Sequence, residues 1–188
     1  MMAGQTVGIP SEPIPEPLNP NMARVFAYWR EKCAETEPGP FPRLAEINII
    51  DLHDIAAYLL ITDVIREEGA RTRYRWRFWG SNLTSFFGKE MTGKLIDEAY
   101  TPEAARQIIA TYDWMVEHRE PHYWVRRGGL AYEDQEHLRY ERLICPIQGP
   151  SGDIDHLFGI ITFVAGPARH FDAADRSKAT KASISPDK

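Results

Sequence analysis

The chain has 188 residues and a formal net charge of −5, and 43% of its residues are hydrophobic and 26% charged. This length and mixture are typical of one globular domain with tails. Its arginines are scattered along an acidic chain rather than gathered in a basic stripe, which excludes an obvious nucleic-acid or anionic-membrane surface.

Cysteine usage and targeting signals set further limits. Cys33 and Cys145 are far apart and form no CxxC pair, so neither a disulfide framework nor a zinc site is indicated. No apolar stretch approaches the roughly 20 residues of a membrane span, and the Pro-rich N-terminus lacks a signal-peptide pattern. We therefore expect a cytoplasmic protein that binds neither nucleic acid nor a membrane.

The predicted organisation is one domain between two tails. Prolines among small and polar residues predict a loose or polyproline-like tail over residues 1–18. The polar end of the chain predicts a second flexible tail over 168–188. The folded domain is expected to cover 19–167.

An amphipathic helix is predicted to open the domain, with Asn19 as its N-cap and Pro20 in its first turn. Its apolar face follows helical spacing. This face either covers the protein's own sheet or pairs with a second chain, and the pattern leaves both readings open. The candidate dimer-interface residues are therefore Met22, Val25, Phe26 and Trp29.

Two strands are predicted next, after a short irregular stretch expected to hold two single-turn helices. Residues 56–65 are apolar on both faces, which is typical of a covered central strand. Residues 73–80 alternate strictly, so that Tyr74, Trp76 and Phe78 are expected to face one way and three arginines and Trp79 the other.

The remaining elements complete an α+β pattern. Short helical pieces are predicted over 82–100, a long helix over 103–118, and strands over 122–130, 138–147 and 156–164. The first and fifth strands are apolar on both faces, whereas the second and third carry arginines. This distribution predicts a five-stranded antiparallel sheet in the order 2-1-5-4-3.

Residues 88–95, GKEMTGKL, come within one position of the phosphate-binding P-loop pattern. Leu95 stands where that pattern requires Ser or Thr, and no parallel βαβ arrangement accompanies it. We instead expect Gly88 and Gly93 to form turns with positive φ, and Met91 and Leu95 to hold this connection to the core.

This element order, with a helical insert between strands two and three, resembles the PAS fold and in particular a bacterial family of stand-alone PAS-like proteins. The resemblance covers nearly all of 22–165. The matching segments are YW (28–29), GPFPR (39–43), YLLITDV (58–64), YRWRFWGSNL (74–83), FFGKEMTGKLID (86–97), Pro121, ERLICPI (141–147) and DHLFGI (155–160). The resemblance implies a non-enzymatic sensory or regulatory module, often with a small-ligand cavity and frequently a homodimer. It supplies no catalytic residues.

The sequence does not name a cofactor for such a module. The Asn-Cys-Arg-Phe motif of flavin photosensors is absent, and His118 lies in the last turn of the long helix rather than at a haem-facing position. Pro121 separates His118 from His122, so the pair does not indicate a metal site. Cys145 is expected to be a small buried residue. The candidate ligand-lining residues are Trp76, Phe78, Phe86, Phe87, Met91, Tyr112 and Trp124.

Two alternative functions remain open at this stage. A cone-shaped NTF2-like fold, which hosts some isomerases and dehydratases, would require Asp63 to be buried in a cavity near a histidine. The long helix between strands two and three argues against that fold. The other alternative is an interaction module without a ligand. For the favoured reading, a small molecule or a signalling protein is the expected partner, and the signal is expected to leave through dimer geometry, the N-terminal helix or the tails.

Overall fold

The computed structural model of the protein describes residues 10–36, 39–127 and 139–164. Its elements are α1 (Pro20–Glu35), the 3-10 turns η1 (Leu44–Glu46), η2 (Ile49–Leu52) and η3 (Ala56–Tyr58), β1 (Leu59–Ile65), β2 (Arg73–Trp79), α2 (Ser81–Phe87), α3 (Ile96–Ala99), α4 (Pro102–His118), β3 (His122–Arg127), β4 (Arg139–Gln148) and β5 (Ile154–Val164). The predicted tail over 168–188 lies outside the described residues, as do the predicted strand residues 128–130 and 138.

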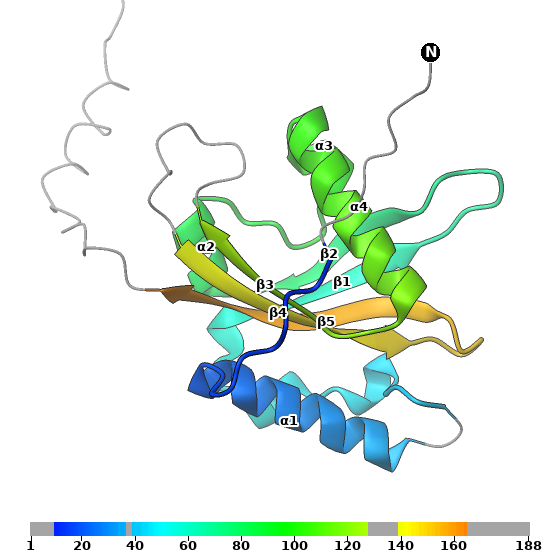
Figure 1. The fold of residues 1–188 in the computed structure, drawn as a ribbon. Helices are drawn as coiled ribbons and strands as arrows, with labels where there is room; N and C mark the ends of the chain where they lie inside the picture. Colours follow the sequence, from blue (N-terminus) through cyan, green and yellow to red (C-terminus); the bar gives the residue numbers. More distant parts are fainter. Residues whose placement is uncertain (1–9, 37–38, 128–138, 165–188) are drawn as a thin grey trace, which may run out of the picture.

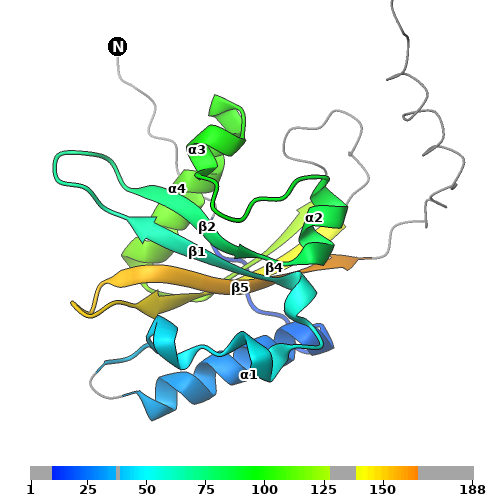
Figure 2. The ribbon, with the colours of Figure 1, turned by 180° about the vertical axis from the view of Figure 1, so that it is seen from behind.

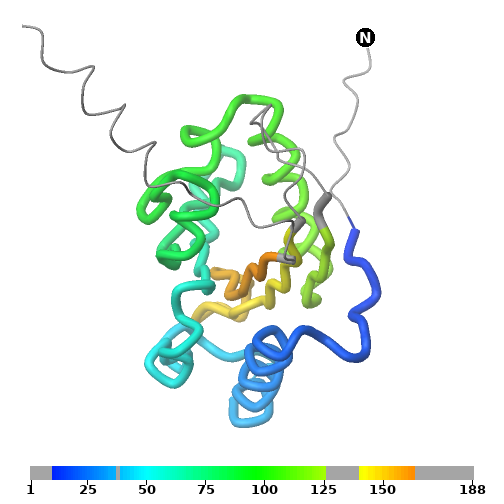
Figure 3. Tube along the Cα trace, turned by 90° about the vertical axis from the view of Figure 1, so that its left-hand side faces the viewer, coloured from blue at the N-terminus to red at the C-terminus, as the bar shows by residue number. Residues whose placement is uncertain are grey.

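The five strands form one antiparallel sheet in the order β2-β1-β5-β4-β3. The predicted sheet order and the helical insert between the second and third strands are therefore confirmed. Figures 1 and 3 show three layers, with α1 and the 3-10 turns on one face of the sheet and the insert helices and α4 on the other. Figure 2 shows the same arrangement from behind. Because both faces are covered, β1 and β5 are apolar on both sides.

Each face of the sheet has its own hydrophobic core. The α1 core lies between the sheet and α1 and includes Met22, Val25, Trp29, Leu59, Ile61, Leu143, Cys145, Ile147, Phe158 and Ile160. The insert core lies between the sheet and α2, α3 and α4 and includes Leu60, Tyr74, Trp76, Trp79, Leu83, Met91, Ile96, Ile108, Tyr112, Met115, Tyr140, Ile144 and Leu157. Burial on both sides of one sheet supplies the main stabilisation of the fold.

The N-terminal helix begins where predicted, since the Asn19 side chain accepts a hydrogen bond of 3.0 Å from the Asn21 amide. Its apolar face covers the protein's own sheet. Met22 and Val25 are fully buried there, and the Trp29 indole donates to the Pro146 carbonyl oxygen at 2.9 Å. Those three candidate dimer residues are thus used within the monomer. Phe26, the fourth, is only half-buried.

One predicted orientation in β2 is wrong. Ile61 pairs with Phe78, but Thr62 pairs with Trp76, so β2 contains one extra residue, Arg77, at this point. A bulge of this kind reverses the alternation of side chains beyond it. Phe78 therefore packs against the α1 core, and Trp79 joins Trp76 in the insert core.

The segment that resembles a P-loop covers the outer edge of β2. The Gly93 amide donates to the Trp76 carbonyl at 2.6 Å, and the Trp76 amide donates to the Lys94 carbonyl at 3.1 Å. Gly88 and Gly93 have φ values of 69° and 81°, as predicted. Met91 is buried, whereas Leu95 is only half-buried and the adjacent Ile96 takes the core position. The segment therefore protects a sheet edge, and its Gly93 amide is used in that contact.

Residues 10–18, which we call the strap, cover the opposite edge at β3. The sequence predicted a loose tail here, but the Glu12 amide donates to the Tyr123 carbonyl at 2.9 Å and the Tyr123 amide donates to Ser11 Oγ at 3.0 Å. Ile14 and Leu18 also pack against the α1 core. Figure 3 shows the strap running beside the sheet toward α1. Both edges of the sheet are therefore covered by irregular segments of the same chain.

Candidate ligand site

The aromatic residues predicted to line a ligand site come together in the insert core, with one exception. β2 contributes Trp76, α2 contributes Phe86 and Phe87, and α4 contributes Tyr112. Met91 is buried in the same core, and Trp124 lies on the same face because it contacts Tyr140 at 6.5 Å between ring centroids. Phe78 is the exception, since the bulge in β2 turns it to the α1 face.

Sequence reasoning missed further aromatic side chains of this core, among them Trp79, Tyr140 and Phe163. Phe163 stacks on Phe86 with 3.6 Å between ring centroids, and Phe87 lies 5.5 Å from Tyr140. Tyr140 was foreseeable, because alternation along β4 places it on the same face as Ile144. Trp79 was not, because the bulge is invisible in the sequence.

The insert core also holds polar groups that lack hydrogen-bond partners among the described residues. These are the indole Nε1 atoms of Trp76 and Trp79 and the hydroxyl of Thr62. The three side chains are between 0 and 6% exposed. A buried donor without an acceptor costs about 1–3 kcal/mol, so such groups usually contact a water molecule or a ligand.

Tyr112 lies among these unpartnered groups. Its ring contacts Tyr74 edge-on at 5.3 Å between centroids, and its phenol lies beside Thr62 and Trp76, outside hydrogen-bond geometry. Burial raises the pKa of Tyr112, whereas the charge of Arg142 acts in the opposite direction. The net direction is upward, so Tyr112 stays a neutral phenol at physiological pH.

Arg142 places a positive charge in this aromatic surrounding. Its side chain projects from β4 and is 7% exposed, and its guanidinium carbon lies 5.3 Å from the ring centre of Trp124 and 5.9 Å from that of Tyr112. Its Nε and Nη2 atoms have no hydrogen-bond partner among the described residues. Contact with aromatic rings is worth about 0.5–2 kcal/mol, whereas burying an ion costs several kcal/mol. The two rings therefore offset only part of the cost.

A second charged cluster lies on the opposite face of the sheet. Asp63 is 5% exposed. One of its carboxylate oxygens accepts from Arg75 at 2.9 Å, and the other accepts from Arg77 at 2.6 Å and lies 3.1 Å from His156 Nδ1. Burial raises the pKa of Asp63, but the hydrogen bonds from Arg77 and Arg75 outweigh burial and lower it.

This environment disfavours the enzymatic alternative. Asp63 is buried near a histidine, as the NTF2-like reading required, but both of its oxygens are already paired with arginines. A carboxylate with a lowered pKa is a weak general base at neutral pH. The sheet order, with the long helix between β2 and β3, also differs from the alternative fold.

The described histidines at the end of α4 and the start of β3 pack against a tryptophan. His118 stacks on Trp114 at 4.2 Å and His122 meets the same ring edge-on at 5.6 Å. Within the described ranges, no three His, Cys, Asp or Glu side chains are grouped so as to hold a metal ion. Burial raises the pKa of Cys33 to about 11 and that of Cys145 well above its ordinary value, so neither is a thiolate at neutral pH.

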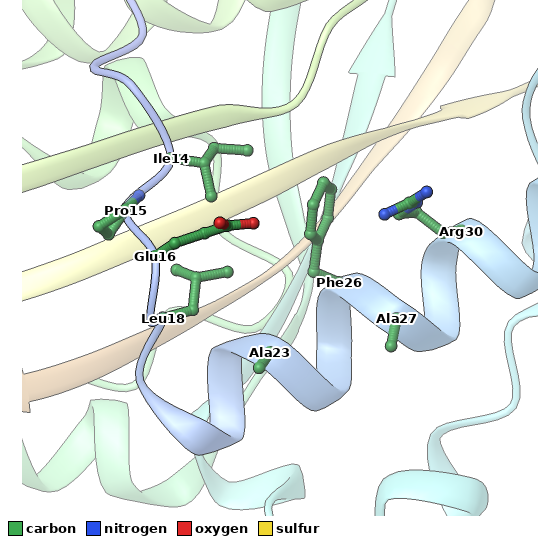
Figure 4. A pocket seen from close by; sticks show the side chains of 8 residues that line it. All are labelled: Ile14, Pro15, Glu16, Leu18, Ala23, Phe26, Ala27 and Arg30. Atoms are coloured by element: carbon green, nitrogen blue, oxygen red, sulfur yellow. The ribbon is translucent and has the colours of Figure 1, made fainter.

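An open groove lies between the strap and α1 (Figure 4). Its lining comes from both segments and comprises Ile14, Pro15, Glu16, Leu18, Ala23, Phe26, Ala27 and Arg30. In Figure 4 the side chains of Ile14, Glu16 and Leu18 point toward Phe26. The half-buried ring of Phe26 lies in this groove between apolar and charged neighbours. None of the helices in the described part of the chain is long and apolar enough to cross a bilayer.

Comparison with known proteins identifies the family. Residues 18–162 match the family described as "PAS domain". Among solved structures, the PAS domain from Bordetella pertussis BvgS shares 17% identity over 72% of this chain and 94% of that one, with a TM-score of 0.46. A sensory box sensor histidine kinase from Vibrio cholerae shares 18% over 62% and 87%, with a TM-score of 0.42. A sensory box histidine kinase/response regulator from Burkholderia thailandensis shares 16% over 73% and 100%, with a TM-score of 0.36. No curated protein matches the chain.

Proposed function

The chain belongs to the PAS domain family, and from this membership we propose that it is a non-enzymatic sensory module that binds a small molecule between its sheet and helices α2 to α4. The observation that carries the proposal is the pair of buried indole N–H groups, Trp76 Nε1 and Trp79 Nε1, that have no acceptor in the described part of the chain. Ligand sites in proteins combine apolar and aromatic linings with a few polar groups of this kind. The insert core has both.

The signal is proposed to leave through α1 and the strap. β4 and β5 contribute to both cores, so a change in the insert core can be transmitted across the sheet to the face that α1 covers. The groove beside Phe26 lies at the junction of α1 and the strap. This groove is the surface proposed to contact a second copy of the chain or a signalling protein.

Native mass spectrometry and an absorption spectrum of one purified preparation test the ligand. We expect the protein to carry an additional small mass, or to acquire one from a small-molecule extract of the cells that produced it. Trp79→Phe keeps an aromatic ring, although a smaller one, and removes the indole N–H, so it should weaken retention of that mass. Trp114→Phe is the matched control, since Trp114 is only partly buried at the edge of the insert core, where it stacks on His118. A preparation that neither carries nor acquires a ligand would contradict the proposed ligand site.

Thr62→Val separates a ligand site from a hydroxyl that is merely buried. Valine has nearly the same shape and removes the unpartnered oxygen. In the ligand-free protein the change should be neutral or stabilising, because an unsatisfied polar atom is removed. Loss of the bound mass together with unchanged thermal stability of the ligand-free form would support a direct contact.

An interaction module without a ligand is the second candidate, favoured by the strap groove. Light scattering after size exclusion tests it, with Phe26→Gln as the variant and Arg106→Gln on the exposed face of α4 as the control. A dimer that Phe26→Gln disrupts and the control preserves would support contact through this groove. A monomer at all concentrations would remove the homodimer from the proposal.

A further inference from the structure

Arg142 carries a buried positive charge that a general ligand-binding role does not require. Aromatic rings and indole N–H groups can contact almost any flat, polar molecule. A cation inside the core, by contrast, favours a ligand of negative charge. Only 7% of the surface of Arg142 is exposed. It takes part in none of the ion pairs found among the described residues.

Its neighbours include further polar groups without a partner among the described residues. Thr62 Oγ1 and Trp76 Nε1 lie beside the Tyr112 phenol, and that phenol lies under the Arg142 guanidinium. The indole is a donor only and the guanidinium has five N–H donors and no acceptor. A molecule bound here would therefore have to supply acceptors for the indole and guanidinium N–H groups.

We propose that the ligand of this site carries an anionic group, a carboxylate or a phosphate, that binds the guanidinium of Arg142, and a flat apolar part that packs against the surrounding aromatic rings. The inference rests on the proposed function. The unpartnered Nε and Nη2 atoms of Arg142 form the fork that a carboxylate or phosphate accepts from in a bidentate manner. Water could satisfy the donors but would leave the buried charge uncompensated.

Aromatic probes that differ only in charge test this assignment. Calorimetric titration of the full chain with benzoate, phenyl phosphate and benzamide compares a carboxylate, a phosphate and an uncharged isostere. At least one anion is expected to bind roughly 10- to 100-fold more tightly than benzamide, as hydrogen bonds to a charged group require. Whichever anion binds more tightly identifies the preferred head group.

Arg142→Met removes the charge while keeping an apolar side chain of similar length. Its anion preference should vanish, while its affinity for benzamide stays within about threefold of wild type. Arg106→Met, which removes a charge on the exposed face of α4, should keep the preference. The folded state is checked by circular dichroism. If Arg142→Met fails to fold, Arg142→Gln replaces it with the same expectations.

The outcomes separate this inference from the proposed function. Equal affinities for the three probes, or an anion preference that survives in Arg142→Met, would overturn the anionic ligand while a bound uncharged molecule still supported the sensory role. Absence of binding to all three probes, combined with no retained mass in native mass spectrometry, would overturn both.

Discussion

The indole Nε1 of Trp29 donates a 2.9 Å hydrogen bond to the backbone oxygen of Pro146, a residue 117 positions later in the chain. Pro146 lies on β4 beyond the end of β3, whose first residue, His122, pairs with Ile144. The bond therefore joins α1 to the sheet and gives a buried backbone acceptor its partner. Trp29, a candidate dimer-interface residue, is therefore engaged in a contact within its own chain.

Replacing Trp29 with Phe should lower the free energy of unfolding by about 1–3 kcal/mol, because the Pro146 carbonyl loses its donor inside the core. Urea denaturation measures the loss. Phe26→Leu is the matched control on the same helix, since Phe26 is half-buried and its side chain has no hydrogen-bonding group. This change should lower the free energy of unfolding by less than about 1.5 kcal/mol. Equal losses in the two variants would contradict the importance of the indole donor.

A second prediction concerns the Asp63 cluster. Asp63→Asn should destabilise the protein by about 1–3 kcal/mol at neutral pH, because two arginine hydrogen bonds lose their charged acceptor. Asp54→Asn is the control. Asp54 pairs with Arg24 at the surface, where the two side chains are 50% and 47% exposed, so its replacement should destabilise the protein much less than that of Asp63.

The same cluster gives a pH dependence with a definite sign. The pKa of Asp63 is lowered in the folded chain, so its contribution is complete above the ordinary carboxyl value of 3.8 and is lost as pH falls through the lower, folded value. Urea midpoints of wild type and Asp63→Asn should therefore converge as the pH is lowered below 3.8. A constant difference across that range would show that the cluster does not act through the carboxylate charge.

Local patterns in the sequence were sufficient for the sheet order, because β2 and β3, whose clustered arginines predicted edge strands, lie at the two edges. They were insufficient for the side-chain directions in β2. Arg77 reads as one more step of a strict alternation, yet it is the extra residue of a bulge, and everything after it changes face. No local signal distinguishes such a residue from an ordinary one, so Trp79 was assigned to the wrong side and Phe78 with it.

The strap and the buried arginine were missed for a different reason. Proline-rich composition describes a segment's own preference, whereas Glu12 and Ser11 are held by an edge strand more than 100 residues away. Arg142 likewise reads as a surface residue of β4, since alternation alone cannot show that α4 and Trp124 enclose it. Both features depend on tertiary contacts.

Two glycines flanking α2 provide a third prediction. Gly80 has φ −61°, which any residue adopts, but an added Cβ would meet the Ala57 carbonyl group. Gly88 has φ 69° with open space around the Cβ position. Gly88→Ala should therefore cost only backbone strain, about 1–2 kcal/mol, and Gly80→Ala at least about 3 kcal/mol. Thermal or urea unfolding ranks them, and the reverse order would show that the Ala57 backbone moves away without cost.

The final prediction tests whether the strap is bound to β3. The Glu12 amide donates to the Tyr123 carbonyl, so Glu12→Pro removes the donor that anchors the strap. Hydrogen exchange should then accelerate at the Tyr123 amide, which donates to Ser11, by roughly 5- to 10-fold for one lost hydrogen bond. Glu12→Gln keeps the amide and the side-chain acceptor and should leave exchange unchanged. If exchange at Tyr123 is the same in both variants, the strap does not protect this edge in solution, and the role proposed for it in passing a signal is lost.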